Sequence, residues 1–382
     1  MFSKLKRPRQ PTDLFHCFRR LSRPFGPWRA CLLVLMAPII HLEMHGMNIG
    51  AEGTHPKEET GPRKVVVGSA LFSIFEEWPG LETRLQTLGA LVDEMAVQAH
   101  KDFDRGLDLA LLPEYAVTGG GVAKDVAVPL TGPVEEFFSA LASKHSTYLV
   151  VPMILAEDRD ADLYSNAAIL FDRQGKVAGI YRKMFPVAVP GDGDLEGGLT
   201  PGRVAPVFNT DFGRIGVQIC WDINYDEGWK ALAEGGAEIV LWPTASPQTL
   251  LPSARASAMN AYLLSSTPRD NATLFDPLGM VFSQVALSPG EEGPLLLVEE
   301  IDLSYLVMGW QPALRDGAAL VDEFGDKVGF RYSSREDRGL FWSNDPAKSI
   351  EEMVRALGLE TMPNQIQRSR AMGAEILNTT EK

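Results

Sequence analysis

Apolar runs recur along this chain between helical patterns, and this alternation limits the possible folds more than any other feature. Runs such as "VVVGSALF" (65–72) and "EIVLWPT" (238–244) are apolar at consecutive positions, which is typical of strands covered on both faces. Strand pairs joined by short turns are predicted at 165–183, 205–220 and 273–285. Helices are predicted at 81–99, 132–145, 226–237 and 253–266. The pattern predicts an α/β fold in which two sheets pack face to face and helices cover them.

We expect four regions along the 382 residues. They are a signal or targeting segment (1–51), a linker (52–63), the α/β domain (64–303) and a C-terminal extension (304–382). In the extension only 349–358 has a convincing helical pattern. The apolar residues there are too irregular to predict a separate core, so we expect Trp310 and Trp342 to be buried on the body or on a second subunit.

The first segment differs in charge from the rest of the chain. Residues 1–51 carry eight Lys and Arg against two acidic residues, whereas the whole chain has a net charge of −14. The apolar stretch 30–40 is too short to span a bilayer, which needs about 20 residues, but it suits a signal peptide. We therefore expect export to the periplasm or the medium. The alternative is a cytoplasmic protein that starts at Met36, Met44 or Met47.

The charge also limits the partners. A net charge of −14 argues against unspecific binding to nucleic acid or to anionic membranes. No stable membrane span is expected. A small molecule is therefore the expected partner.

The three cysteines are divided between the first segment and the body. Cys17 and Cys31 belong to the first segment, so Cys220 is the single cysteine of the body. It has no partner for an internal disulfide or a thiolate metal cluster. Because Cys220 follows an apolar strand and precedes a helical pattern, nearby N–H groups would lower its pKa and bind an oxyanion. It is either an inert buried thiol or a nucleophile.

Two other ionisable residues also follow apolar strands. Glu114 comes directly after "LALLP", and Lys183 ends "GIYRK". The carboxyl ends of strands are where α/β proteins assemble their sites. An acid, a cation and a thiol together suit nucleophilic catalysis, with a base and an oxyanion stabiliser beside the nucleophile.

The three segments resemble the motifs of the nitrilase superfamily of carbon–nitrogen hydrolases. They are "PEYAVTG", "GIYRK" and "GVQICWD", and they occur in the family's order. The resemblance covers roughly residues 64–303 and implies a four-layer α-β-β-α sandwich with a C-terminal extension. It implies that Glu114 is the general base, that Lys183 stabilises the oxyanion and that Cys220 is the nucleophile.

The resemblance also implies supporting residues. Glu196 matches the family's second glutamate, and the backbone N–H of Trp221 would donate to the oxyanion. Tyr115, Trp221 and Trp242 indicate either an aromatic substrate pocket or ordinary core packing. The family reaction needs no metal and no organic cofactor, and we expect none here. The resemblance further implies a homodimer or a higher homo-oligomer, with helix 226–237 at the interface.

The expected reaction is hydrolysis of a small amide or an N-carbamoyl amide through a cysteine acyl-enzyme. Asp222 stands where nitrile-cleaving relatives usually have Glu, which favours amides over nitriles. Ile223, Asn224 and Tyr225 stand where some carbamoyl-amino-acid hydrolases place arginine, so an acidic substrate would need another cation, for instance Arg255 or Arg269. The alternatives are nitrile hydrolysis, acyl transfer to an acceptor other than water, and binding without catalysis.

Overall fold

The structure is a computed structural model, and it describes residues 61–75, 77–188, 191, 193–288, 290–291 and 293–380, without the side chain of Thr380. The predicted signal segment, most of the predicted linker, Cys17 and Cys31 lie outside these residues.

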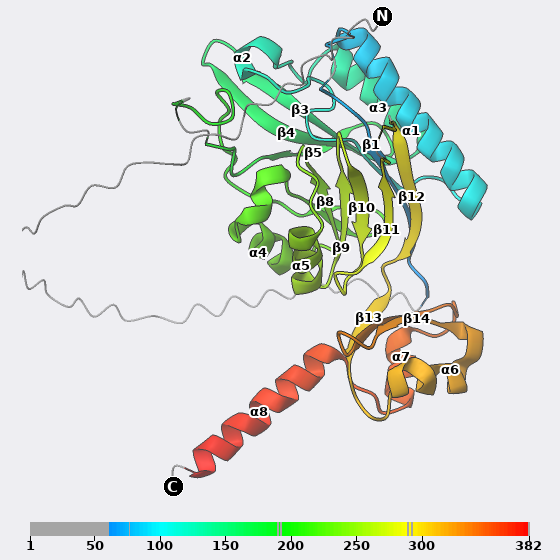
Figure 1. Cartoon of the computed structure of the whole chain (residues 1–382). Helices are drawn as coiled ribbons and strands as arrows, with labels where there is room; N and C mark the ends of the chain where they lie inside the picture. Colours follow the sequence, from blue (N-terminus) through cyan, green and yellow to red (C-terminus); the bar gives the residue numbers. More distant parts are fainter. Residues whose placement is uncertain are drawn as a thin grey trace, which may run out of the picture. The chain divides into compact units, whose positions relative to one another are not determined.

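The first sheet has six strands in the order β12-β1-β2-β3-β4-β5. These strands are β1 (Lys64–Leu71), β2 (Leu109–Leu111), β3 (Tyr148–Asp158), β4 (Leu163–Phe171), β5 (Val177–Arg182) and β12 (Leu295–Asp302). The strands β1, β2 and β3 run parallel, and the other pairs are antiparallel. The helices α1 (Leu81–Phe103) and α3 (Pro133–His145) cover the outer face of this sheet (Figure 1). The short helix α2 (Ala123–Val126) lies between them in the sequence.

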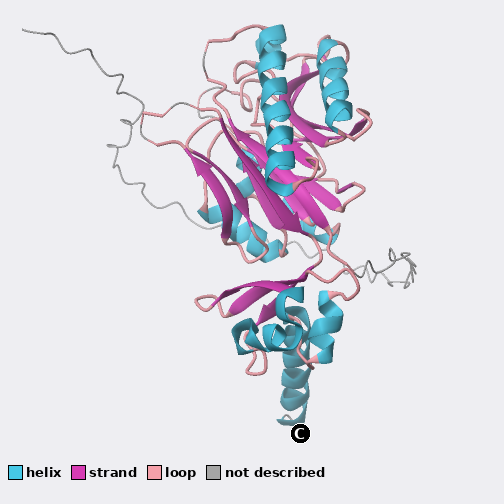
Figure 2. Ribbon diagram, turned by 90° about the vertical axis from the view of Figure 1, so that its right-hand side faces the viewer, coloured by secondary structure: helices cyan, strands magenta, loops and turns pink. Residues whose placement is uncertain are grey.

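The second sheet also has six strands, in the order β11-β10-β9-β8-β7-β6. These strands are β6 (Phe208–Asn209), β7 (Arg214–Val217), β8 (Ile239–Pro243), β9 (Tyr262–Ser266), β10 (Asn271–Phe275) and β11 (Val281–Ala286). The helices α4 (Glu227–Glu234) and α5 (Leu250–Met259) cover its outer face. Strands and helices thus form separate layers (Figure 2).

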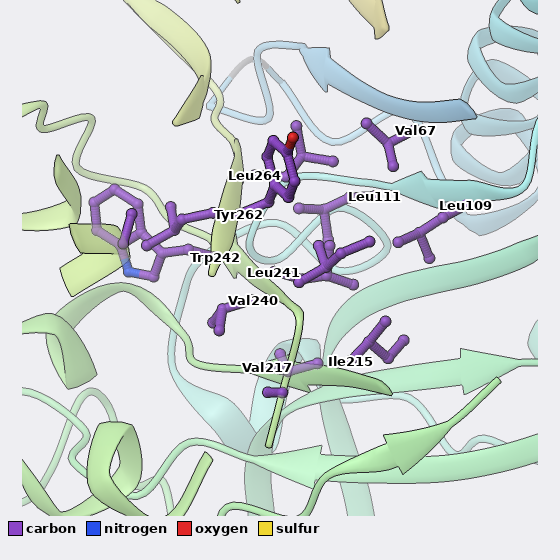
Figure 3. Close-up of a cluster of buried hydrophobic side chains, with 14 of the residues drawn as sticks. Val67, Leu109, Leu111, Ile215, Val217, Val240, Leu241, Trp242, Tyr262 and Leu264 are labelled. Atoms are coloured by element: carbon purple, nitrogen blue, oxygen red, sulfur yellow. The ribbon is translucent and has the colours of Figure 1, made fainter. Parts of the chain in front are cut away.

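Alternate residues of one strand point into two different cores. Val65 and Val67 of β1 belong to the core between the two sheets, whereas Val66 belongs to the core under α1 and α3. Figure 3 shows part of the core between the sheets, with Val67 and Leu109 from the first sheet and Ile215 from the second. Apolar side chains on both faces of a strand require this double covering. The prediction of a four-layer α-β-β-α sandwich is therefore confirmed.

The prediction of a single helix over 253–266 is wrong. The helix α5 ends at Met259, Asn260 adopts a left-handed conformation with φ 49° and ψ 46°, and the strand β9 follows. Asparagine tolerates this conformation better than most residues and ends helices in this way. The five residues of β9 are all buried, so their apolar pattern comes from cover on both faces of the sheet.

The expectation that the C-terminal extension lacks a core of its own is also wrong. It contains a three-stranded sheet and three helices, and buried residues such as Met308, Phe341 and Met353 form a separate cluster. Its elements are β13 (Tyr305–Gly309), β14 (Val328–Ser333), β15 (Arg338–Ser343), α6 (Ala318–Phe324), α7 (Ile350–Ala356) and α8 (Met362–Thr380). Most of these elements are short, and the 19-residue α8 leaves apolar residues such as Ile366 and Met372 exposed, so the sequence shows no long apolar pattern that would indicate a core.

The extension packs on the body of its own chain. The Nη2 of Arg338 donates to the Oγ of Ser257 over 2.7 Å, and Arg331 forms an ion pair with Asp276. The prediction for the two tryptophans is confirmed for Trp342, whereas burial of Trp310 on a second subunit stays a prediction. Trp342 packs against the main core, but the side chain of Trp310 is 59% exposed. No helix among the described residues is long and apolar enough to cross a membrane.

Candidate active site

The structure brings together the three residues that the sequence analysis singled out. Glu114 follows β2 and Lys183 follows β5 in the first sheet, and Cys220 follows β7 in the second. All three stand just after the carboxyl end of a strand. The site is thus built from both sheets, and neither sheet carries it alone.

Lys183 lies between two carboxylates. Its Nζ is 3.1 Å from the Oε1 of Glu114 and 2.8 Å from the Oε1 of Glu196. The side chains of Lys183 and Glu114 are each 1% exposed. Burial alone would lower the pKa of Lys183, but the negative charge of Glu114 and smaller effects from its neighbours raise it. The ammonium therefore stays charged and balances one of the two carboxylates.

The second carboxylate, Glu196, has a different protonation equilibrium. Burial, followed by the charge of Glu114, raises the pKa of Glu196 to about 8. Two buried carboxylates share one ammonium here, so ionisation of the second is unfavourable. The backbone N–H of Val187 and the hydroxyl of Tyr115 both donate to Glu196. Glu196 and Tyr115, both predicted as supporting residues, therefore lie in the site.

Two further groups hold Glu114, and the sequence analysis missed both. The Nδ2 of Asn166 donates to the Oε1 of Glu114 over 2.8 Å, and the backbone N–H of Ala245 donates to the Oε2 over 2.6 Å. Asn166 lies within β4 and is completely buried. A polar residue inside the otherwise apolar run "SNAAILF" is the signal that would have found it, because buried amides need partners.

Cys220 stands at the start of a short 3₁₀ helix, Cys220–Asn224, with a φ of 45°. A non-glycine residue in this left-handed region is strained, and such residues concentrate at functional sites. Burial and then the charge of Glu114 raise the pKa of the Cys220 thiol to about 12, although Lys183 and a hydrogen bond with Thr244 act in the opposite direction. The thiol needs a base to become a nucleophile, and the Glu114 carboxylate lies near enough for its charge to raise the pKa of the thiol.

Asp222 lies beside Cys220 but is turned into the protein. Its Oδ2 accepts hydrogen bonds from the hydroxyl of Tyr181 and the N–H of Ile219, and its Oδ1 accepts one from the N–H of Phe185. The Asp222 side chain is fully buried. In the sequence Asp222 serves only to favour amides over nitriles, and these contacts are not predicted from it.

The aromatic residues proposed for a substrate pocket have different surroundings. Trp221, which directly follows Cys220, is 39% exposed. Trp242 is completely buried, and its Nε1 donates to the carbonyl of Cys220 over 3.1 Å. Trp242 is therefore a core residue that supports the backbone of Cys220. The rings of Phe185 and Tyr225 stack at 3.9 Å.

The two arginines considered for an acidic substrate already have partners. Arg255 donates to the carbonyls of Ile223 and Tyr225 and forms an ion pair with Asp226. The half-exposed Arg269 pairs with its neighbour Asp270. Arg255 therefore supports the segment that follows Cys220.

The arrangement provides a proton acceptor, a fixed cation and a thiol within one buried cluster. These are the groups that acyl transfer through a covalent intermediate requires. In the described parts of the chain, no group of three or more His, Cys, Asp or Glu side chains is arranged to hold a metal ion. The expectation that the reaction needs no cofactor stays a prediction.

Comparisons with known proteins agree with this chemistry. The profile of the carbon–nitrogen hydrolase family matches residues 77–307. A hydrolase of Schizosaccharomyces pombe is 28% identical over 226 residues, which are 53% of this chain and 68% of that protein. Omega-amidase NIT2 of Danio rerio is 28% identical over 225 residues, which are 53% of this chain and 79% of that protein. The crystal structure of Saccharomyces cerevisiae Nit3, a nitrilase-superfamily member, is similar with a TM-score of 0.53 and 22% identity over 65% of this chain and 93% of that one.

Proposed function

This chain belongs to the carbon–nitrogen hydrolase family, and from this premise we propose that it hydrolyses a small amide or an N-carbamoyl amide through an acyl-enzyme on Cys220. The observation that supports the proposal best is the convergence of Glu114, Lys183 and Cys220 from two sheets onto one buried cluster. The similarity to an omega-amidase favours amides over other carbon–nitrogen bonds.

In the first half-reaction Glu114 takes the proton of the Cys220 thiol. The sulfur then attacks the carbonyl carbon of the amide, and the carbonyl oxygen becomes an oxyanion beside the ammonium of Lys183. The N–H of Trp221 is the second donor proposed for this oxyanion. Glu114 returns the proton to the nitrogen, the carbon–nitrogen bond breaks, and ammonia or an amine leaves a thioester on Cys220.

In the second half-reaction Glu114 takes a proton from water. The hydroxide attacks the thioester carbon, the carbon–sulfur bond breaks, and the proton returns to the sulfur. Asn166 and Ala245 hold the Glu114 carboxylate in one orientation, so the same group serves both halves. The protonated form of Glu196 leaves the ammonium of Lys183 balanced by Glu114 alone, which suits a cation that must meet a new negative charge.

The test is ammonia release from a panel of primary amides, N-carbamoyl amino acids and nitriles. We expect Cys220→Ala to lose at least about 10⁴-fold in rate while keeping its melting temperature, because the covalent path is removed. Lys124→Ala, at an exposed helical site, is the control for the mutagenesis.

Retained hydrolysis in Cys220→Ala would contradict the proposal. Hydroxylamine in the same assay separates hydrolysis from acyl transfer. If hydroxamate formation replaces acid formation at low hydroxylamine concentrations, an acceptor other than water is the natural one.

The assembly is part of the same proposal. We expect a homodimer or higher oligomer whose interface includes α4, and we expect part of the C-terminal extension nearby. The outward face of α4 carries Ala231 and Ala233 between charged residues, and small residues of this kind allow close helix packing. Export through the segment 1–51 stays a prediction, which N-terminal sequencing of the native protein tests.

A further inference from the structure

We propose that Asp222 is a positioning residue whose carboxylate fixes the Cys220 thiol relative to the ammonium of Lys183. The inference rests on the proposed function, in which both groups must meet the same carbonyl. It assigns Asp222 a role in alignment, and none in proton transfer.

The first observation is how the two carboxylate oxygens are used. The Oδ1 accepts the N–H of Phe185 over 2.9 Å. The Oδ2 accepts the N–H of Ile219 over 2.9 Å and the hydroxyl of Tyr181 over 2.7 Å. Because the side chain is fully buried and both oxygens are bonded to protein groups, it is not placed to exchange protons with a substrate.

The second observation is where these partners lie in the sequence. Tyr181 and Phe185 stand two residues before and two residues after Lys183, so the carboxylate holds the lysine segment at both ends. Ile219 immediately precedes Cys220, so the same carboxylate also holds the start of the strained turn. The segments come from different sheets, with β5 in the first and β7 in the second.

The third observation is the strain at the nucleophile. Cys220 has a φ of 45°, a conformation that persists only where the surroundings impose it. The carboxylate of Asp222 accepts the N–H at the start of the turn, as an acidic residue of a capping box does. The Nε1 of Trp229 donates to the carbonyl of Asp222 over 3.0 Å, so the backbone of this residue is also held.

Replacement by asparagine changes the hydrogen bonding and leaves the shape unchanged. A carboxylate accepts at both oxygens, whereas an amide presents an NH₂ group at one of them. In Asp222→Asn that NH₂ group faces either the N–H of Phe185 or the N–H of Ile219. One of the two segments is then released, and the sulfur and the ammonium are no longer aligned.

Two probes of Cys220 separate alignment from reactivity. Iodoacetamide forms a carbon–sulfur bond with loss of iodide and a proton, and this reaction needs no oxyanion stabiliser. Butyraldehyde adds to the thiol as a thiohemiacetal. In that adduct the sulfur binds the carbonyl carbon and the proton moves to an oxygen that lies beside Lys183 when the site is aligned. Aldehyde binding is measured as protection of Cys220 against iodoacetamide, by mass spectrometry of the peptide that contains it.

We expect Asp222→Asn to weaken aldehyde protection by about 30-fold, whereas its iodoacetamide rate changes by less than about threefold. The matched control is Asp276→Asn, another buried carboxylate that accepts backbone N–H groups, from Leu278 and Met280. We expect Asp276→Asn to lower the stability of the protein but to leave the aldehyde protection and the iodoacetamide rate unchanged. Tyr181→Phe removes one of the three donors to Asp222, and we expect it to weaken protection by about threefold.

The inference is overturned if Asp222→Asn matches Asp276→Asn in both readings, or if aldehyde binding and alkylation fall in the same proportion. If Asp222→Asn does not fold, the test rests on Tyr181→Phe. The inference is then overturned if the aldehyde protects Cys220 as strongly in Tyr181→Phe as in wild type. A wild-type protein that is alkylated at Cys220 but shows no aldehyde protection contradicts the proposed function itself, and that outcome is distinct from failure of the Asp222 variant alone.

Discussion

At the scale of single residues, the site buries more negatively charged groups than positively charged ones. The carboxylates of Glu114 and Glu196 both contact the ammonium of Lys183. Because the groups are buried, water does not screen the excess negative charge. The excess is relieved by a proton on Glu196, whose pKa is raised to about 8. The folded protein therefore holds a proton that the unfolded chain releases at much lower pH.

This proton makes stability depend on pH in a defined direction. Below about pH 4.5 Glu196 is protonated in both states, and its contribution to stability is complete. Between 4.5 and 8 only the unfolded chain ionises, so the free energy of unfolding falls as the pH rises. We expect wild type to lose on the order of 4 kcal/mol relative to Glu196→Gln between pH 5 and pH 8.5, as measured by chemical unfolding.

The control for this measurement is Glu157→Gln. Hydrogen bonding from Arg182 lowers the pKa of Glu157, so this group stays ionised throughout that range. The difference in the free energy of unfolding between Glu157→Gln and wild type should therefore be constant between pH 5 and pH 8.5. If the free energies of unfolding of wild type and Glu196→Gln differ by the same amount at all pH values, Glu196 does not hold the proton.

The sequence predicted some site residues and missed others for a physical reason. Glu114, Lys183 and Cys220 each follow an apolar strand, where α/β proteins assemble their sites, and the resemblance of the three motifs to the carbon–nitrogen hydrolases implied their roles. The contacts of Asn166 and Asp222 depend on how β4 and β5 pair and on how the two sheets face one another. No local pattern contains that information.

At the scale of elements, single residues decide where the chain changes from helix to strand. The run 253–266 has apolar spacing that fits a helix, yet Asn260 divides it into α5 and β9. The same limit applies to β2, in which only three residues of the apolar segment before Glu114 form a strand. Apolar runs show where the core lies, but tertiary contacts set the boundaries of elements.

Asn260 gives a test of this interpretation. We expect Asn260→Gly to change the free energy of unfolding by only a few tenths of a kcal/mol, because glycine adopts the left-handed conformation without strain. Asn260→Val should cost about 1–2 kcal/mol, since a β-branched residue fits poorly at positive φ. Chemical unfolding of both variants provides the comparison. Equal stabilities would mean that the end of α5 is fixed by packing alone.

At the scale of the whole molecule, the C-terminal extension has a core that the apolar pattern of its sequence did not predict. Its core forms from single apolar residues on short elements such as α6 and β15, which meet only after folding. The helix α8 has exposed apolar residues, including Ile366 and Met372. The four-layer body was predictable because its central strands, such as β1, β3 and β8, are buried on both faces, whereas the strands of the extension are only partly buried.

The proposed assembly is tested on α4. We expect Ala231→Arg to convert an oligomer into a monomer, because a long charged side chain at the centre of a helix interface prevents close contact. The control is Val97→Arg, on the exposed face of α1, which should leave the mass unchanged. Light scattering at low micromolar concentration measures both. A monomeric wild type with full activity would remove the assembly proposal and leave the catalytic one intact.

The division of the site between two sheets has a consequence for how activity arises during synthesis and refolding. Glu114 and Lys183 reach the site from one sheet and Cys220 from the other. A chain with both sheets formed but not yet docked has its thiol without the base proposed for it. If Glu114 and Cys220 act as proposed, competence for hydrolysis therefore requires the two sheets to dock, and neither sheet acquires it alone.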